Sequence, residues 1–226
     1  MLTDLDVNVT PVNGADCMPS SEPISFDLLH PEPLLIVVSG PSGVGKDSAV
    51  TALQKRNLNL HFVVTTTDRP PRPNEIEGVD YNFVTRERFQ EMIANDEFIE
   101  YNLVYQDYKG VPKRQIHEAF ASGLDVIMRV DVQGAARMRQ LFPEAVLIYM
   151  IPECIKEWCQ QLADRHSETP ETLQRRIETA RIELASLPIF DYVVVNPHDH
   201  LEVAVDRIQA IIEVEHLKVN PRRIQI

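Results

Sequence analysis

Short runs of apolar residues recur along the chain and predict the strands of a buried sheet. The first run, Leu34–Ser39, is almost wholly apolar and leads into a glycine-rich loop. Such runs are typical of strands covered on both faces, because a strand with one solvated face alternates apolar and polar residues. Four later runs have the same character, namely Phe62–Thr65, Val126–Asp131, Val146–Ile151 and Tyr192–Val195.

Stretches with helical spacing of apolar residues lie between or after these runs. One begins after Gly45, and another, Pro170–Ser186, has Thr169 as a capping residue and proline at its first position. Others cover about Gln133–Gln140, Pro152–Asp164 and His200–His216. Since strand and helix signals alternate, the sequence predicts an α/β fold with a doubly wound parallel sheet and helices on both faces.

The pattern changes between about residues 65 and 125. Short mixed segments, Tyr81–Val84 and Phe98–Tyr101, lie among turns and two helical stretches near Arg86–Asn95 and Lys113–Ser122. Strand and helix signals of this length can form a small sheet with its own cover. The sequence therefore predicts an insertion with its own small sheet rather than a separate domain.

The first 33 residues hold five prolines and six acidic residues but no lysine or arginine. This composition predicts a flexible tail, with an interaction motif as the alternative. It fits neither a secretory signal, which starts basic, nor an organelle transit peptide, which is rich in arginine. The chain has three cysteines and no CxxC pair, which indicates reduced thiols, so we expect a cytoplasmic protein.

Acidic residues outnumber basic ones by 34 to 22, giving a formal net charge of −12. General nucleic-acid binding is therefore not expected, because affinity for a phosphate backbone needs an excess of lysine and arginine. No apolar run reaches the roughly 18 residues of a membrane-spanning helix, so no membrane association is expected either. An acidic protein can still bind anions if its few cations gather in one cleft.

A phosphate-binding loop follows the first predicted strand and opens a helix. Its glycines and lysine have the GxxxxGK spacing, in the strand–loop–helix context that the motif requires. Backbone N–H groups of such a loop point at phosphate oxygens, and the lysine adds a full positive charge. The predicted ATP-binding residues are Gly40, Pro41, Ser42, Gly43, Val44, Gly45 and Lys46.

One position of this loop departs from the common pattern. The residue after the lysine is normally serine or threonine, whose hydroxyl ligates Mg²⁺. Here Asp47 follows the lysine, and Ser48 comes next. Carboxylate oxygens suit magnesium, so we predict that Asp47 ligates the ion directly or through water, with Ser48 as the alternative.

A second anion site is predicted after the Phe62–Thr65 run. Arg69 and Arg72 are three residues apart and stiffened by prolines, which makes a rigid fork for an anion. Four further motifs follow in order: Gly78–Phe83, Phe98–Tyr101, Tyr108–Gly110 and Asp131–Gly134. From about Leu34 to about Ile212, this ordered set resembles the guanylate kinase family, whose members transfer a phosphoryl group from ATP to GMP.

The resemblance implies an architecture and a set of roles. The architecture is a P-loop kinase core over residues 34–218, with a small mixed α/β GMP-binding insertion at about 65–125 and a helical lid at about 156–176. Residues 219–226 would form a C-terminal tail. Arg165 and Arg176 would close on the triphosphate as catalytic residues beside Lys46, and Asn196 would lie near the adenine. The implied GMP-binding residues are Thr65, Arg69, Arg72, Tyr81, Glu100, Lys109 and Asp131.

The chemistry of guanine agrees with this role for Glu100. Guanine presents two donors side by side, whereas adenine presents an acceptor at N1, so a carboxylate binds the first and repels the second. A site built in this way can reject an analogue that lacks the donors by about 10⁴–10⁵-fold. The alternative for Glu100 is a solvated carboxylate at a strand edge. Asp131 could instead be a helix-start residue, and surface ion pairs are the alternative for Arg165 and Arg176.

Several positions depart from the family pattern. Lys109 replaces a phosphate-contacting tyrosine, and Val111 removes a hydroxyl near the guanine. Gln161 stands where many members have a lid arginine, and Arg129 replaces the usual acid. Asp47, Lys109 and Arg129 together resemble plastid-type members. The departures at positions 109, 111 and 161 leave the full base specificity and the rate open.

The expected substrates are ATP and GMP, with dGMP as a further acceptor and Mg²⁺ as the cofactor, in a monomer or a homodimer. Two other functions stay open. One is a kinase for another nucleoside monophosphate or a phosphorylated sugar, which Val111 allows but Glu100 and Asp131 oppose. The other is an inactive binding module of guanylate-kinase-like fold, which Asp47 favours and Lys46 opposes.

Overall fold

A computed structural model describes residues 32–56, 59–73, 75–104, 106–163 and 170–225. The described residues belong to one compact unit, Pro31–Ile226. Apart from its last two residues, the predicted tail over 1–33 lies outside them. Within the described part, no helix combines the length and the apolar character needed to cross a membrane.

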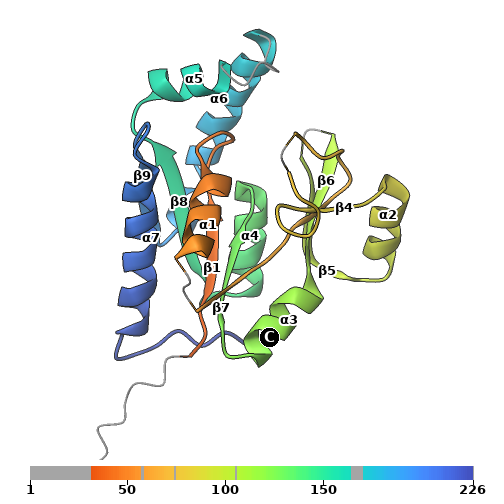
Figure 1. Ribbon diagram of the computed structural model, residues 1–226, viewed down its shortest axis with the longest axis vertical. Coiled ribbons are helices and arrows are strands. Elements are labelled where there is room, and N and C mark those ends of the chain that lie inside the picture. The colour runs from red at the N-terminus through yellow and green to blue at the C-terminus, as the bar shows by residue number, and fades with distance from the viewer. Residues whose placement is uncertain (1–31, 57–58, 74, 105, 164–169, 226) are drawn as a thin grey trace, which may run out of the picture. The chain divides into compact units, whose positions relative to one another are not determined.

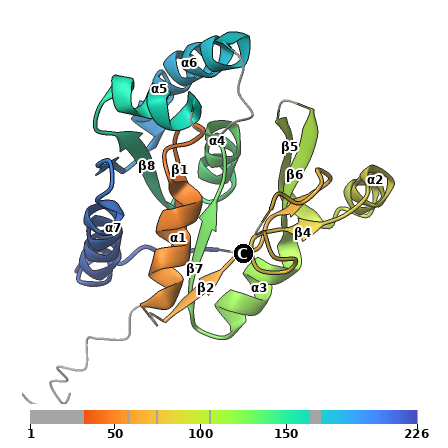
Figure 2. The same ribbon diagram turned by 45° about the horizontal axis from the view of Figure 1, so that its top comes forward.

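Five parallel strands form the main sheet, in the order β2-β7-β1-β8-β9. Figure 1 labels β7, β1, β8 and β9 of this sheet, and Figure 2 labels β2. Each strand of the inner pair β1 and β7 is buried along nearly all its length, as expected for strands covered on both faces. The strands are β1 (Leu35–Ser39), β2 (Leu60–Phe62), β7 (Asp125–Arg129), β8 (Val146–Pro152) and β9 (Tyr192–Asn196).

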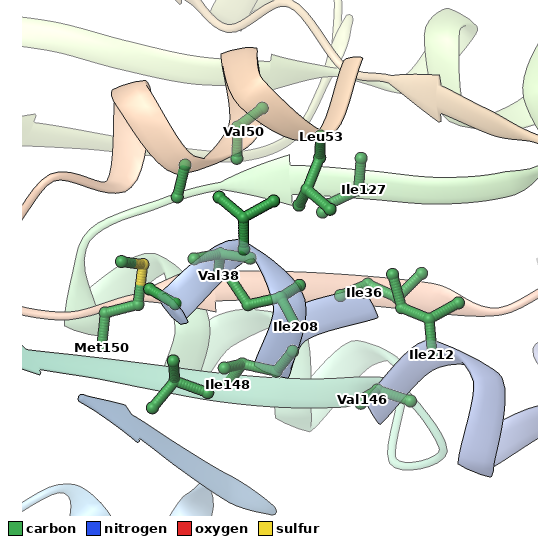
Figure 3. Close-up of a cluster of buried hydrophobic side chains, with 14 of the residues drawn as sticks. Ile36, Val38, Val50, Leu53, Ile127, Val146, Ile148, Met150, Ile208 and Ile212 are labelled. Atoms are coloured by element: carbon green, nitrogen blue, oxygen red, sulfur yellow. The ribbon is translucent and has the colours of Figure 1, made fainter. Parts of the chain in front are cut away.

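Helices cover both faces of this sheet, which confirms the predicted fold class. Ile36 and Val38 of β1 point to a face packed by α1 (Lys46–Lys55) and α7 (Leu201–His216), and Figure 3 shows this cluster. Leu35 and Val37 point to the opposite face, where α3 (Lys113–Ala121) and α4 (Val132–Leu141) pack. The alternation follows from the period of two in a strand.

The insertion has a sheet of its own, in the order β4-β3-β6-β5. Its covering helix, α2 (Arg86–Ala94), begins at the N-cap Thr85 and packs Phe89 against Phe98 and Tyr108. The strands are β3 (Thr66–Thr67), β4 (Asn82–Phe83), β5 (Phe98–Val104) and β6 (Asp107–Pro112). This confirms the predicted small mixed sheet, to which β6 adds a strand that the sequence pattern did not indicate.

The predicted strand Phe62–Thr65 is wrong in its bounds, because the chain changes sheets there. β2 ends at Phe62, and Val63 makes one more bond, from its N–H to the carbonyl of Ile127 in the main sheet. Thr65 already accepts a hydrogen bond from Asn82 of the second sheet. The apolar run therefore covers a crossover between two sheets.

Two helices lie beside the loop that follows β1. Figure 2 shows α5 (Ile155–Ala163) and α6 (Pro170–Leu184) next to each other at this end of the sheet. α5 begins three residues later than predicted because β8 continues through Pro152. A short 3₁₀ helix, Leu187–Ile189, then leads into β9.

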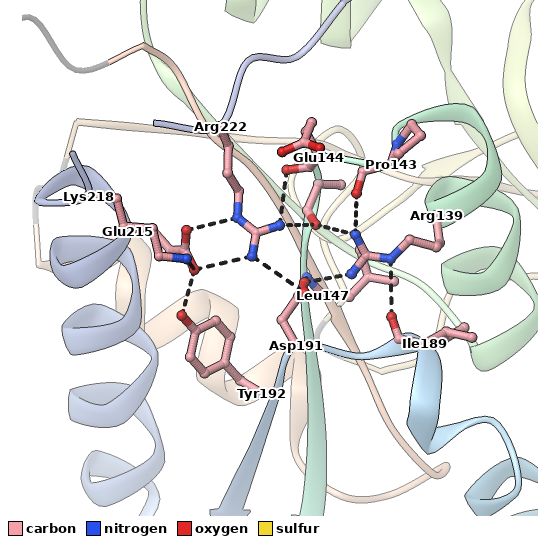
Figure 4. A network of polar contacts seen from close by, with 11 residues as sticks. Arg139, Pro143, Glu144, Leu147, Ile189, Asp191, Tyr192, Glu215, Lys218 and Arg222 are labelled. Atoms are coloured by element: carbon pink, nitrogen blue, oxygen red, sulfur yellow. Dashed lines mark hydrogen bonds and ion pairs between the residues drawn. The ribbon is translucent and has the colours of Figure 1, made fainter. Parts of the chain in front are cut away.

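A polar network at the other end of the sheet ties down the last described residues (Figure 4). Arg222 pairs with Glu215 at 2.8 Å and with Asp191 at 3.4 Å. Asp191 also accepts from Arg139 at 2.6 Å and from the N–H of Leu147 at 2.8 Å. The segment after α7 is therefore held against β8 and β9.

Candidate active site

A single cleft at the carboxyl edge of the main sheet collects most of the predicted functional residues. The loop after β1, the end of β7, helix α6 and the insertion all contribute to its wall. Ligands in open α/β sheets bind at this edge. The predicted residues that line it are Gly40, Ser42, Gly43, Gly45, Lys46, Asp47, Ser48, Thr65, Arg69, Arg72, Tyr81, Glu100, Lys109, Asp131 and Arg176.

The phosphate-binding loop curls through glycines in conformations that other residues avoid. Gly40, Gly43 and Gly45 have φ angles of 140°, 85° and 92°, and the helix begins only at Lys46. The Lys46 ammonium donates to the carbonyl of Gly40 at 2.6 Å and to that of Pro41 at 3.0 Å. Burial lowers the pKa of Lys46 to about 8, against an opposing effect of Asp47. A bound phosphate would favour the charged form of Lys46.

Three side chains hold this loop in place through hydrogen bonds. Trp158 of α5 donates its indole N–H to the Ser42 carbonyl at 3.0 Å, and Arg176 of α6 donates to the Ser42 hydroxyl at 2.6 Å. Asn196, at the end of β9, donates to the Val44 carbonyl at 2.9 Å. Pro41, Val44 and Asn196 contact or form the loop but do not line the cleft. The predicted lid residue Arg165 lies outside the described residues.

Three cations surround the ring of Tyr81 on the insertion side of the cleft. The guanidinium carbons of Arg69 and Arg129 both lie 4.9 Å from the ring centroid, and the Lys109 ammonium lies 5.8 Å from it. Glu75 pairs with Arg69 through both carboxylate oxygens, at 2.6 and 2.7 Å, and further raises the pKa of Arg69. Like charges gathered in this way favour an anion between them.

Arg72 and Thr65 add groups to the same side. Arg72 is exposed along the cleft, and its backbone N–H donates to Glu75 at 2.7 Å. Thr65 is buried, and its hydroxyl has no hydrogen-bond partner in the described part of the chain. Because a buried hydroxyl without a partner is costly, Thr65 is positioned to bond a ligand.

Glu100 is buried on β5 with only 7% of its surface exposed, which rules out the solvated edge carboxylate. It lies opposite Val111 in the β5–β6 pairing, and Asn102 donates to its Oε2 at 3.0 Å. Burial, with the charge of Asp131, raises the pKa of Glu100 to about 8. Such a carboxyl favours a ligand that offers hydrogen-bond donors.

Asp131 both starts a helix and lines the cleft, which are the two roles that the sequence left open. Its carboxylate caps α4 by accepting from the N–H of Gly134 at 2.8 Å, as a helix-start residue does. It also lines the cleft, and its charge acts on the pKa values of Lys46 and Glu100. The cap fixes where this charge lies.

Asp47 has a partner that sequence analysis did not anticipate. Its Oδ1 lies 2.9 Å from Nε of Arg129, whose side chain is 10% exposed. The described residues contain no group of three or more His, Cys, Asp or Glu side chains that could hold a metal ion. The nearby guanidinium opposes an ion bound directly to this carboxylate, and the role of Asp47 as a magnesium ligand stays a prediction.

Five residues that line the cleft were not predicted as site residues, namely Val104, Asp107, Arg129, Val130 and Glu183. Arg129 was identified only as a departure from a family pattern, and Glu183 was not singled out at all. Glu183 lies on α6, seven residues after Arg176, so both fall on one face of the helix and both line the cleft. That spacing was the available signal. Burial raises the pKa of Glu183 to about 7, while Lys46 opposes the shift.

Comparisons with known proteins give consistent matches. A family model described as Guanylate kinase matches residues 32–215. The protein named Guanylate kinase 2, chloroplastic/mitochondrial, from Oryza sativa subsp. japonica is 45% identical over 208 residues, which are 92% of this chain and 72% of the rice protein. The guanylate kinase of Halalkalibacterium halodurans is 41% identical over 185 residues, 82% of this chain and 90% of the relative.

Structural similarity points the same way. The crystal structure of guanylate kinase from Anaplasma phagocytophilum matches with a TM-score of 0.68 at 28% sequence identity. The match covers 85% of this chain and 90% of that one. It includes most of the chain that forms the two sheets and the cleft described above.

Proposed function

The chain belongs to the guanylate kinase family, and we infer from this premise how its cleft converts ATP and GMP into ADP and GDP. The observation that carries the inference is the presence, in one cleft, of a phosphate-binding loop and a buried carboxyl group on the insertion. The loop can bind the triphosphate of ATP, and Glu100 can bind the guanine of GMP.

On the ATP side, the loop N–H groups and Lys46 bind the phosphates. Arg176 donates to Ser42 of the loop, and we propose that it adds a second cation at the γ-phosphate. Asn196 supports the loop through Val44, and we propose that it lies near the adenine. Arg165 stays a proposed lid cation.

On the GMP side, the phosphate binds among Arg69, Arg72, Tyr81 and Lys109. Glu100 accepts the two guanine donors, while the unpartnered Thr65 hydroxyl supplies a bond that the valine at position 111 lacks. Because these contacts address base and phosphate rather than the sugar, we expect dGMP to be accepted as well.

The reaction itself asks little covalent chemistry of the protein. A phosphate oxygen of GMP attacks the γ-phosphorus of ATP, the bond from that phosphorus to the β-bridging oxygen breaks, and ADP leaves. The cations of the cleft stabilise the charge on the transferred group, and alignment of the two substrates lowers the entropic part of the barrier. Closure over the cleft would exclude the water that hydrolyses ATP.

Mg²⁺ is the expected companion of ATP in this enzyme class. The Asp47–Arg129 pair speaks against Asp47 as its direct ligand, and Ser48 offers only one exposed hydroxyl along the cleft. We therefore assign no step of the reaction to a protein-bound metal ion.

A coupled assay of ADP release across GMP, dGMP, AMP, CMP and UMP tests the proposal. We expect turnover with GMP and dGMP and rates with AMP lower by about 10³-fold or more. A preference for AMP would contradict the assignment of Glu100. Absence of turnover with any of the five would favour an inactive binding module.

Three further expectations remain proposals with simple tests. We propose a cytoplasmic protein, although the rice relative is named chloroplastic/mitochondrial, and imaging of a tagged chain checks this. Light scattering distinguishes a monomer from a homodimer. Limited proteolysis tests the proposed domain bounds of 34 and 218.

A further inference from the structure

Arg129 lies where the two halves of the cleft meet. It ends β7, pairs with Val38 of β1 in the strand register, and lines the cleft. Its Nε contacts Asp47 in the first turn of α1, directly behind the phosphate-binding loop. Its Nη2 donates to the carbonyl of Asp80 on the insertion. One cation thus contacts both the ATP side and the GMP side.

The guanidinium keeps donors for a ligand. It carries five N–H groups. Nη2 donates to Asp80, whereas Nε lies 2.9 Å from Asp47 as an ion pair and makes no hydrogen bond within the described part of the chain. Nη1 contacts no acceptor among the residues that the structure describes. Planar guanidinium donors match phosphate oxygens, and the ring of Tyr81 beneath Arg129 belongs to the proposed GMP phosphate site.

The ion pair also changes what position 47 can do. In the common loop a hydroxyl at this place ligates Mg²⁺. Here the carboxylate is 2.9 Å from a guanidinium nitrogen, so a metal ion bound to it would face a fixed positive charge at short range. The Arg129 guanidinium therefore already supplies, at this end of the loop, a positive charge of the kind that a metal ion would bring.

We propose that Arg129, held in place by Asp47, binds phosphate between the two nucleotides and supplies there the positive charge that a metal ligated at position 47 would otherwise provide. Asp47 is then a positioning residue for Arg129. The inference rests on the proposed function, because it requires both nucleotides in the cleft.

Arg129→Gln is the principal test, since glutamine removes the charge and the contact with the Asp80 carbonyl but keeps an N–H donor near the Nε position that faces Asp47. We expect kcat to fall by about 10²-fold, the usual loss when one transition-state donor is removed. Calorimetry should show GMP binding weakened about tenfold, typical of a lost charged hydrogen bond, with guanosine binding unchanged. Arg137→Gln is the matched control, because Arg137 lies on α4 away from this cleft and contacts Gln140.

Two more variants separate ligand binding from a structural role. Arg129→Lys keeps a cation without the planar fork and should recover part of kcat; it also serves if Arg129→Gln does not fold. Asp47→Asn should lower kcat through loss of the pairing, while the free Mg²⁺ concentration for half-maximal rate stays that of the wild type.

Three results would overturn the inference. One is an equal loss of GMP and guanosine affinity in the Arg129 variants, which would show that the residue has a structural role and does not bind the phosphate. The second is a kcat within twofold of the wild type in both variants. The third is an increased Mg²⁺ requirement in Asp47→Asn. If instead the wild type fails to phosphorylate GMP, the proposed function itself is wrong.

Discussion

At the scale of single residues, the cleft gives an acidic and a basic side chain similar pKa values. The two are Glu100, which acts as an anion, and Lys46, which acts as a cation. Burial and Asp131 raise the pKa of Glu100 to about 8, while burial lowers that of Lys46 to about 8. In each case the fold disfavours the charged form until a substrate compensates it. Both groups therefore depend on their ligands for the charge with which they act.

Glu100→Gln tests whether Glu100 recognises the guanine base through hydrogen bonds. An amide accepts one hydrogen bond and donates another, so it mismatches one of the two guanine donors, and kcat/KM for GMP should fall by about 10³-fold. KM for ATP should stay the same. Glu118→Gln, on the exposed side of α3, is the control. An unchanged kcat/KM for GMP in Glu100→Gln would rule out this role.

The same variant should gain stability in mild alkali. The pKa of Glu100 is about 8 in the fold against 4.5 in the reference state, so its contribution is most favourable below pH 4.5 and declines as pH rises towards 8. Glutamine removes that cost. Thermal melts above pH 8 should therefore show a higher melting temperature for Glu100→Gln than for the wild type, with no gain at acidic pH.

The two substrates should respond to pH in opposite directions. With ATP saturating, kcat/KM for GMP should rise as pH passes about 8, because Glu100 becomes a carboxylate. With GMP saturating, kcat/KM for ATP should fall over the same range, because free Lys46 loses its proton. Steady-state rates between about pH 6 and about pH 10 check both limbs. Parallel profiles would contradict the assignment.

Sequence could predict only some of these residues. Lys46 and Arg69 belong to short motifs with fixed spacing, so the pattern alone identified them. Arg129 and Glu183 come from a strand end and a distant helix, and their importance arises from neighbours that only the fold supplies. The pairing of Asp47 with Arg129 was hidden for the same reason.

At the scale of elements, the phosphate-binding loop depends on close packing against its neighbours. A Cβ on Gly40 would lie 2.2 Å from the backbone carbonyl oxygen of Met150 in β8, and one on Gly43 would lie 2.5 Å from Leu162 of α5. Long apolar runs predicted the main strands well, because two buried faces leave a clear signal. β3 and β4 have two residues each, too few for any periodicity.

Gly40→Ala should damage the junction between β1 and β8. A φ of 140° costs about 1–3 kcal/mol for a residue with a side chain, and the overlap with backbone adds to it, so we expect a total loss of about 3 kcal/mol or more. Gly78→Ala is the control, since Gly78 has a φ of 75° but open space around it. Denaturant unfolding compares the two, and equal losses would contradict the argument.

At the scale of the whole molecule, the net charge of −12 coexists with a cleft rich in cations. The fold achieves this by drawing arginines and lysines from several elements to one edge of the sheet. At the opposite end of the main sheet, charged side chains pair with one another and stabilise the fold. There the buried carboxylate of Glu215 contacts Tyr192, Lys218 and Arg222.

Arg222→Ala should destabilise the fold strongly. Burial alone would raise the pKa of Glu215, but hydrogen bonds from Arg222, Lys218 and Tyr192 lower it to about 2. The network therefore stabilises the protein above pH 4.5, and this contribution is lost as pH falls towards 2. Removing one partner of a buried pair costs about 3 kcal/mol. The neighbouring Arg223→Ala, at an exposed position, should change little.

The deficit of Arg222→Ala should also shrink in acid, because protonated Glu215 no longer needs its partner. Chemical denaturation at neutral pH and near pH 2 measures this difference. A deficit of equal size at both pH values would show that Arg222 acts by packing rather than by charge.

The chain contains one tryptophan, and its indole N–H is bonded to the loop that holds the triphosphate. Its fluorescence therefore reports from a single known place. Occupation of the loop by ATP should alter the emission intensity or wavelength, whereas guanosine alone should leave the spectrum nearly unchanged. The protein thus carries an intrinsic optical sensor with which ATP binding can be timed without any label, apart from binding at the guanine site.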